Sequence, residues 1–202
     1  MTANTMRKIL LALCLLPLAA ASLAQPTPFP PPEPVAITGP YIVGSFGRSE
    51  AKKGCLGVIS GGGRTCDPTD LAFGFGLGYQ ATRHFGVEAN YLNLGQVKAR
   101  GVTSTEEIHT TLWDLTGTGA VPFGESYAAY AKFGLYRATL DTTVRNIRDA
   151  TKIDLTYGGG LQWNLDRKLG VRVQWQRFKK VGGTSYGINN YDVLSGGVLW
   201  RF

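Results

Sequence analysis

The last twelve residues, Tyr191 to Phe202, read Y-D-V-L-S-G-G-V-L-W-R-F and alternate in polarity with a period of two. Successive side chains of a β-strand point to opposite faces, so such a strand has one apolar face and one small or polar face. The two faces consist of Leu194, Gly196, Val198, Trp200 and Phe202 on one side and Ser195, Gly197 and Arg201 on the other. A strand of a membrane barrel shows this pattern, with apolar side chains towards lipid and small or polar ones towards the lumen. For this segment alone, a buried edge strand of a soluble sandwich is the alternative.

The ending of the chain also fits the C-terminal signal of bacterial outer-membrane barrels. Gly197 is followed three residues later by the aromatic residue Trp200, and the chain ends on Phe202. Trp200 and Phe202 share one face of the strand, as a barrel-assembly machinery that reads one strand edge would require. We therefore predict that Gly197, Trp200 and Phe202 form an assembly signal.

The first 38 residues divide into a signal peptide and a tail. Arg7 and Lys8 precede an apolar run at residues 9–18, and small residues end the segment at Ala24. These features predict a signal peptide over residues 1–24, because the run is too short to span a bilayer. Residues 25–38 are rich in Pro, which lacks the donor that a sheet needs, and they predict a periplasmic tail. The predicted barrel occupies residues 39–202.

Eight alternating segments fill this region, joined by short turns and long polar loops in alternation. The strands are predicted at Tyr41–Arg48, Asp70–Gln80, Phe85–Leu94, Ile108–Val121, Tyr127–Thr139, Ile153–Asn164, Val171–Phe178 and Tyr191–Phe202. The turns are predicted at residues 81–84, 122–126 and 166–168, and the loops at 49–69, 95–107, 141–151 and 179–190. This asymmetry predicts an all-β fold, an eight-stranded antiparallel up-and-down transmembrane barrel in the outer membrane, with short turns in the periplasm and long loops outside. The glycines Gly74, Gly76 and Gly78 oppose large apolar residues, which indicates a narrow lumen.

Two cysteines and the net charge bear on the surface of the protein. Cys55 and Cys66 lie in one polar loop of an exported protein, so we predict a disulfide; a metal site is the weaker alternative, because Asp67 alone is a nearby ligand. The formal charge is +7, or +5 without residues 1–24, which hold two basic residues and no acidic one. On an exported protein this charge favours lipopolysaccharide as a partner over nucleic acid.

The chain resembles the OmpA-type transmembrane domain, the small eight-stranded barrel of Gram-negative outer membranes, over about residues 39–202. The matching motifs are G-F-G-L-G-Y-Q-A-T-R-H-F-G-V-E-A-N-Y at 74–91, G-G-G-L-Q-W-N-L-D-R-K-L-G-V-R-V-Q-W at 158–175 and L-S-G-G-V-L-W-R-F at 194–202. Full-length members continue into a peptidoglycan-binding domain. This chain ends at Phe202, so that activity is not expected here. The family holds an ion-pair cluster across the lumen, and Glu88, Lys132 and Arg172 match three of its positions. Gln162 and Thr118 stand where the family has a further carboxylate and a lysine.

The resemblance implies a non-enzymatic barrel with a structural or surface-interaction role, binding outer-membrane lipid and extracellular ligands through its loops, and at most a small gated, porin-like pore. The lumen cluster is predicted to be a structural plug, with an ion gate as the alternative. A lipid A-modifying barrel enzyme is the second function class. Such a site needs a histidine beside a carboxylate and a nucleophile, whereas His84 and His109 are expected at opposite barrel ends. No catalytic residue, cofactor or metal is predicted.

Overall fold

The protein is described by a computed structural model, which covers residues 38–52, 65–100, 105–142, 150–181 and 190–202. Within these residues every regular element is a β-strand, and no helix is long and apolar enough to cross a membrane. The strands are β1 Gly39–Lys52, β2 Thr65–Asp67, β3 Thr69–Gln80, β4 Phe85–Arg100, β5 Thr105–Phe123, β6 Tyr127–Thr142, β7 Ala150–Asn164, β8 Leu169–Lys179 and β9 Asn190–Arg201.

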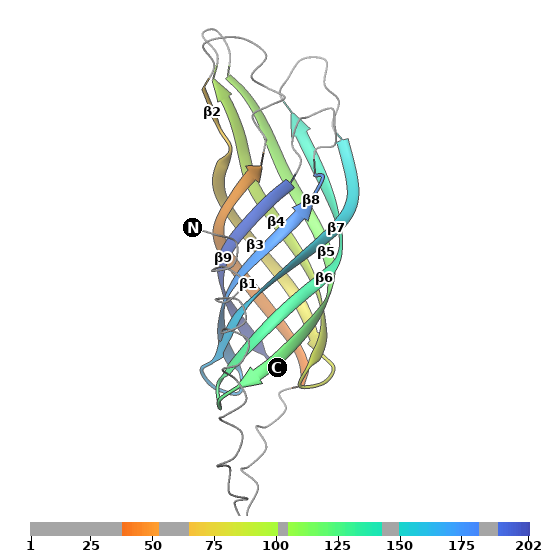
Figure 1. Cartoon of the computed structure of the whole chain (residues 1–202), viewed down its shortest axis with the longest axis vertical. Helices are drawn as coiled ribbons and strands as arrows, with labels where there is room; N and C mark the ends of the chain where they lie inside the picture. Colours follow the sequence, from red (N-terminus) through yellow and green to blue (C-terminus); the bar gives the residue numbers. More distant parts are fainter. Residues whose placement is uncertain (1–37, 53–64, 101–104, 143–149, 182–189) are drawn as a thin grey trace, which may run out of the picture. The chain divides into compact units, whose positions relative to one another are not determined.

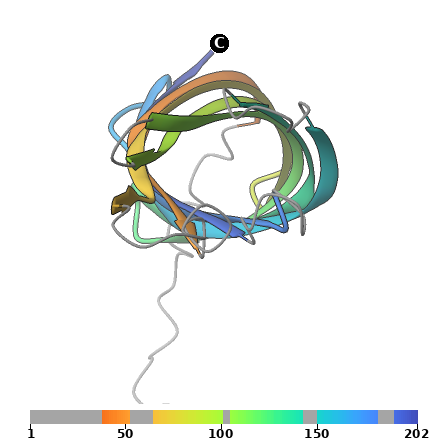
Figure 2. The ribbon, with the colours of Figure 1, turned by 90° about the horizontal axis from the view of Figure 1, so that it is seen from above.

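The sheet closes on itself (Figures 1 and 2). All neighbours are antiparallel and follow the order β2-β4-β3-β1-β9-β8-β7-β6-β5, and a further β4–β5 ladder joins the two sides of the sheet. The chain termini of the barrel pair with each other, because β1 lies against β9 from Tyr41↔Arg201 to Lys52↔Asn190. Eight strands form the wall, and the short β2 is added beside β4. The predicted eight-stranded antiparallel up-and-down barrel is confirmed.

The barrel is apolar outside, as the alternating pattern predicts. Its outward row on β3 is the clearest example and consists of Leu71, Phe73, Phe75, Leu77 and Tyr79, all exposed. The glycines opposite this row are covered by large side chains from neighbouring strands. A Cβ atom added at Gly78 would lie 2.1 Å from the Tyr41 ring, and one at Gly76 would lie 2.1 Å from the Asn90 side-chain oxygen. The glycine column therefore makes room for Tyr41 and Asn90 in the lumen.

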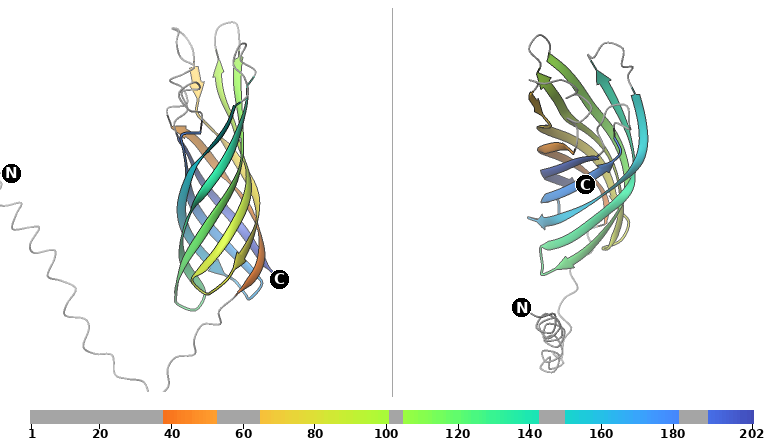
Figure 3. Two further views of the ribbon diagram at one scale, coloured as in Figure 1. Left: turned by 90° about the vertical axis from the view of Figure 1, so that its right-hand side faces the viewer. Right: turned by 45° about the horizontal axis from the view of Figure 1, so that its top comes forward.

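Several strands extend further towards the loop end than the sequence predicts. β4 and β5 run through most of the expected loop 95–107 and project beyond their neighbours (Figure 3). The β4–β5 register shifts between Asn93 and Gln96, where Gly95 has a φ of 76°, a conformation that favours glycine. The backbone N–H of Gln96 donates to Asp70 Oδ2 at 2.7 Å, so the bulge is held by a side chain of β3. The prediction of a loop at residues 95–107 was wrong for most of these residues, because the bulge lets β4 and β5 continue to pair.

The first expected loop also contains a paired segment. β2 pairs with β4 between Asp67↔Lys98 and Thr65↔Arg100, in line with β3. Pro68, which has no N–H to donate, separates β2 from β3. The predicted turn at 122–126 is shorter than expected, because Pro122 still belongs to β5. Residues 1–37 and Cys55 lie outside the described residues.

The turn between β7 and β8 is closed by one carboxylate. Asp166 Oδ1 accepts hydrogen bonds from the backbone N–H groups of Lys168 at 2.6 Å and Leu169 at 2.7 Å. The bond from Leu169, followed by that from Lys168, holds the pKa of the Asp166 carboxyl below its usual value, because both donors favour the charged form. These local hydrogen bonds, together with one from the Arg201 backbone N–H to the Lys168 carbonyl oxygen at 2.7 Å, hold the shape of the turn.

We expect Gly78→Ala to destabilise the barrel by about 1–3 kcal/mol, because the new methyl group must displace the Tyr41 ring. The free energy of unfolding of the protein refolded in micelles, measured by urea titration, tests this expectation. Gly119→Ala is the matched control, since a Cβ atom there meets nothing within 4 Å. Equal unfolding midpoints for the two variants would contradict the close packing at Gly78.

Candidate functional site: the barrel lumen

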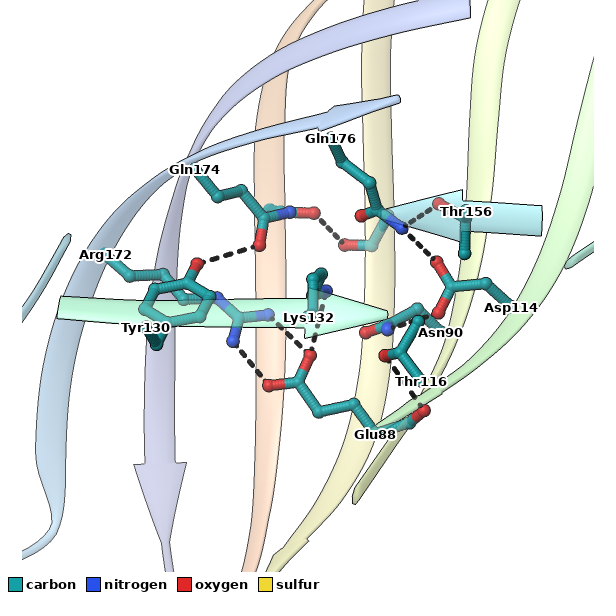
Figure 4. A network of polar contacts seen from close by, with 12 residues as sticks. Glu88, Asn90, Asp114, Thr116, Tyr130, Lys132, Thr156, Arg172, Gln174 and Gln176 are labelled. Carbon is teal, nitrogen blue, oxygen red and sulfur yellow. Dashed lines mark hydrogen bonds and ion pairs between the residues drawn. The ribbon is translucent and has the colours of Figure 1, made fainter. Parts of the chain in front are cut away.

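Glu88 lies at the centre of a buried group of charged side chains inside the barrel (Figure 4). Its carboxylate accepts from Arg172 Nη1 at 2.6 Å and Nη2 at 3.2 Å, and from Lys132 Nζ at 3.1 Å. The Tyr41 hydroxyl donates to Glu88 Oε1 at 2.7 Å. All four side chains are buried. The structure thus brings together Glu88, Lys132 and Arg172, and adds Tyr41.

The three charged residues come from alternate strands, β4, β6 and β8, and reach across the lumen. Each occupies an inward position close to the short turns. Strands between them supply Thr118, which pairs with Lys132, and Gln162, which pairs with Arg172. Gln162 donates to Asn164 Oδ1 instead of joining the charged group. Burial of these charges is tolerated because each has an opposite charge and hydrogen bonds.

A second buried carboxylate, Asp114 on β5, was missing from the predicted cluster. Its two oxygens accept from Asn90 Nδ2 at 2.8 Å and Gln176 Nε2 at 2.9 Å, and Gln176 also donates to Thr156 at 3.0 Å. Together with Glu88 it supplies two negative charges against two positive charges. The polar lumen cluster, defined as Tyr41, Glu88, Asn90, Asp114, Thr156, Lys132, Arg172 and Gln176, is therefore balanced in formal charge.

Above the polar lumen cluster, at the loop end, most inward positions are apolar; the buried hydroxyl groups of Ser49 and Thr110 lie among them and are hydrogen-bonded to the Leu94 carbonyl oxygen and the Tyr191 hydroxyl. This apolar layer consists of Ala51, Ala72, Leu92, Leu94, Leu112, Tyr136, Ala138, Leu140, Phe178, Val181, Tyr191 and Val193. Leu112 is 1% exposed and Phe178 is fully buried, with its ring 5.4 Å from that of Tyr136 in a T-shaped arrangement. The expectation of small or polar inward residues was wrong for this end. An eight-stranded barrel is narrow enough for side chains to fill it, so the layer packs like the core of a soluble protein.

At the level of the apolar layer, the outer surface of the barrel changes from apolar to polar. Tyr136 of the apolar layer is followed by the outward Arg137, and Phe178 is preceded by the outward Arg177. On β9, the outward Asp192 lies between two residues of the layer and binds Arg177 through contacts of 2.6 and 2.7 Å. Adjacent residues of a strand point to opposite faces and lie at nearly the same height. At this level the apolar side chains therefore point into the lumen and the polar ones point outward.

The remaining predicted residues are not joined into a site. His84 lies in a turn with Nδ1 3.0 Å from the Ala120 carbonyl oxygen, whereas His109 lies near the other end of β5. The described part of the chain holds no group of three or more metal-ligating side chains. Trp200 and Phe202 face outward, and Phe202 is 74% exposed. Cys66 belongs to β2, and its predicted disulfide partner Cys55 lies outside the described residues.

A closed antiparallel barrel with eight wall strands and an apolar outer surface defines the class of small integral outer-membrane barrels. The chain belongs to the outer membrane protein beta-barrel domain family, whose model matches residues 10–202. It is therefore a protein of the outer membrane, as the sequence predicts.

Two curated relatives show the OmpA resemblance. Outer membrane protein A of Klebsiella aerogenes is 27% identical over 135 residues, which cover 65% of this chain and 38% of that protein. Outer membrane protein A of Klebsiella pneumoniae is 26% identical over 140 residues, which cover 65% of this chain and 40% of that protein. The chain thus spans about two fifths of the length of these relatives.

Solved structures of similar fold are outer-membrane barrels. Ail of Yersinia pestis, in complex with the heparin analogue sucrose octasulfate, has a TM-score of 0.53 and 16% identity, covering 82% of this chain and 99% of that one. OprG of Pseudomonas aeruginosa has a TM-score of 0.53 and 15% identity, and the match covers 81% of this chain and 97% of OprG. Neisserial surface protein A has a TM-score of 0.52 and 14% identity, and the match covers 83% of this chain and 99% of that protein. At these identities the likeness is one of fold.

Removal of the Glu88 carboxylate should leave Lys132 and Arg172 buried without a counter-ion. We expect Glu88→Ala to lower the free energy of unfolding by about 3–5 kcal/mol. Urea titration of the refolded variant measures this loss, and Glu125→Ala, in the exposed turn before β6, is the control. An unfolding midpoint equal to that of the wild type would show that the cluster does not stabilise the barrel.

Proposed function

We propose that this chain is a non-enzymatic outer-membrane barrel with a sealed lumen, which acts through its surface as a structural and interaction protein. The observation that carries this proposal is the apolar layer stacked on the polar lumen cluster. Two layers of different chemistry lie in series along one narrow lumen. The proposal replaces the small gated pore that the family resemblance implies with a closed barrel.

An ion crossing the lumen would meet both layers. At the polar lumen cluster it would have to separate Glu88 from Lys132 and Arg172, which are held by charge-assisted hydrogen bonds. At the apolar layer it would lose its hydration and meet only a few hydroxyl groups, which are already hydrogen-bonded within the protein, and this costs several kcal/mol or more. Rearrangement of Glu88 alone, as in a gate, leaves the second obstacle in place. We therefore favour a structural plug as the role of Glu88, Lys132 and Arg172.

A sealed lumen leaves the outer surface as the working part of the protein. The wall contacts outer-membrane lipid, and the loops are the proposed site for an extracellular ligand. The excess of basic residues favours anionic partners such as lipopolysaccharide. The signal peptide at residues 1–24, the periplasmic tail at 25–38, the Cys55–Cys66 disulfide and recognition of the ending by the barrel-assembly machinery are predictions within this proposal.

The second function class, a lipid A-modifying enzyme, gains no support from the histidines. His84 and His109 lie near opposite ends of the wall, so neither can complete a cluster with the other. Incubation of the purified protein with lipid A in micelles, followed by a measurement of released acyl chains, tests this point. Release of acyl chains would contradict the non-enzymatic role.

We expect neither the wild type nor Glu88→Ala to conduct in planar bilayers, because the apolar layer remains closed. Conductance should appear only when Glu88→Ala is combined with Phe178→Ser, which replaces a large buried ring of the apolar layer by a small polar side chain. The different migration of boiled and unboiled samples on a denaturing gel verifies that each variant is a closed barrel. Channels formed by Glu88→Ala alone would contradict the second seal, and channels formed by the wild type would contradict the sealed barrel.

We expect Phe202→Ala to impair assembly while leaving the folded barrel stable. Phe202 lies at the chain end on the lipid side, where its ring packs against little else in the protein. The amount of the variant in outer-membrane and periplasmic fractions measures assembly, and urea titration of refolded protein measures stability. Normal accumulation of Phe202→Ala in the outer membrane would contradict its role as a signal.

A further inference from the structure

A shallow hollow of about 250 Å³, open to the surroundings of the barrel, lies on the wall over β5, β6 and β7. Its outward-facing lining consists of Trp113, Leu115, Leu135, Arg137 and Ile153. The ladders place Trp113 beside Arg137 and Arg137 beside Ile153, so these three residues form one row across the strands. Leu115 and Leu135 form the next row towards the turns. The hollow is thus apolar on the side of the turns and has one cation at its other side.

Arg137 occupies the level at which the lipid-facing surface ends. The outward residues of β6 are apolar through Phe133 and Leu135, and beyond Arg137 they are polar, Thr139 and Asp141. Arg137 lies about ten residues above Tyr127 at the turn. In a tilted strand this distance corresponds to roughly 25 Å, the height of the apolar band of outer-membrane barrels. The guanidinium therefore lies at the headgroup level, with the apolar hollow at the level of the acyl chains.

Arg137 differs from another outward arginine at this level. Arg177 is neutralised by Asp192 through two short hydrogen bonds. Arg137 has Trp113 and Ile153 beside it, and within the described residues no carboxylate lies within ion-pair distance of it. A guanidinium stays charged at every physiological pH and matches phosphate oxygens with paired donors. A lipid phosphate at this level has the chemistry to pair with the Arg137 guanidinium.

We propose that Arg137 and the hollow form a binding site for one phosphate-bearing lipid of the outer leaflet. An acyl chain lies in the hollow between Trp113, Leu115 and Ile153, and the lipid phosphate accepts hydrogen bonds from Arg137. This site rests on the proposed surface role and specifies one anionic lipid contact within it. The apolar lining selects a lipid over a free phosphate ion, since a free ion gains nothing from the hollow.

The test compares retention of two lipids with the same chains, dimyristoyl phosphatidic acid and dimyristoyl phosphatidylcholine, by native mass spectrometry of the refolded protein. We expect the wild type to retain phosphatidic acid preferentially and Arg137→Gln to lower that retention about 3- to 10-fold. Ile153→Trp, which fills the hollow and keeps the charge, should lower retention of both lipids. Millimolar inorganic phosphate should displace neither lipid.

Arg48→Gln is the matched control. Arg48 is also outward and exposed at the end of the apolar band, and it lies beside Leu71 and Leu194. Retention in Arg48→Gln should equal that of the wild type. Equal losses in both arginine variants would show attraction by total charge and overturn the site, as would unchanged retention in Arg137→Gln or displacement by inorganic phosphate. The conductance of the wild type tests the sealed barrel separately, so either proposal can fail alone.

Discussion

Closure of the sheet by the β4–β5 ladder is the constraint on which the rest of the structure depends. In hydrocarbon every backbone donor and acceptor must be paired within the protein, and a closed barrel satisfies this with no free edge in the membrane. Eight strands enclose a lumen only as wide as the side chains that fill it. Large inward side chains therefore lie over the neighbouring strands as well as across the lumen, which is why Tyr41 needs a glycine at its ladder partner Gly78.

The narrow lumen also explains the chemistry of its contents. Deep in the barrel the inward residues are charged, and they are stable because Glu88 binds both Lys132 and Arg172 while amide groups satisfy Asp114. In formal charge, two carboxylates in this cluster face two cations, and each charged group is hydrogen-bonded. The apolar layer around Leu112 and Phe178 needs no such pairing, because it is packed as a soluble core is packed.

The exchange of polar and apolar faces near Arg137 follows from the surroundings of the wall. Within the bilayer the outer face meets lipid, so apolar residues face outward and polar residues fill the lumen. Beyond the bilayer the outer face meets water, and the favourable arrangement is reversed. β4 and β5 continue past this level, and their bulge at Gly95 marks the change in pairing. One sheet thus combines a membrane barrel with a conventional β-barrel, and the exchange places Arg137 beside an apolar hollow.

The sequence alone determined the strand number, the antiparallel barrel and the face of each residue, because alternation has a period of two and the turns differ in length from the loops. It placed Glu88, Lys132 and Arg172 inward for the same reason. It could not identify Tyr41 and Asp114 as their neighbours, because alternation gives a side chain's face but says little of its height in a tilted, staggered barrel. It also ended several strands too early, since the bulge at Gly95 and the pairing of β2 depend on contacts with other strands. Only the tertiary structure, by setting strand tilt and register, decided which inward residues meet and that a layer of apolar side chains lies above the charged group in the lumen.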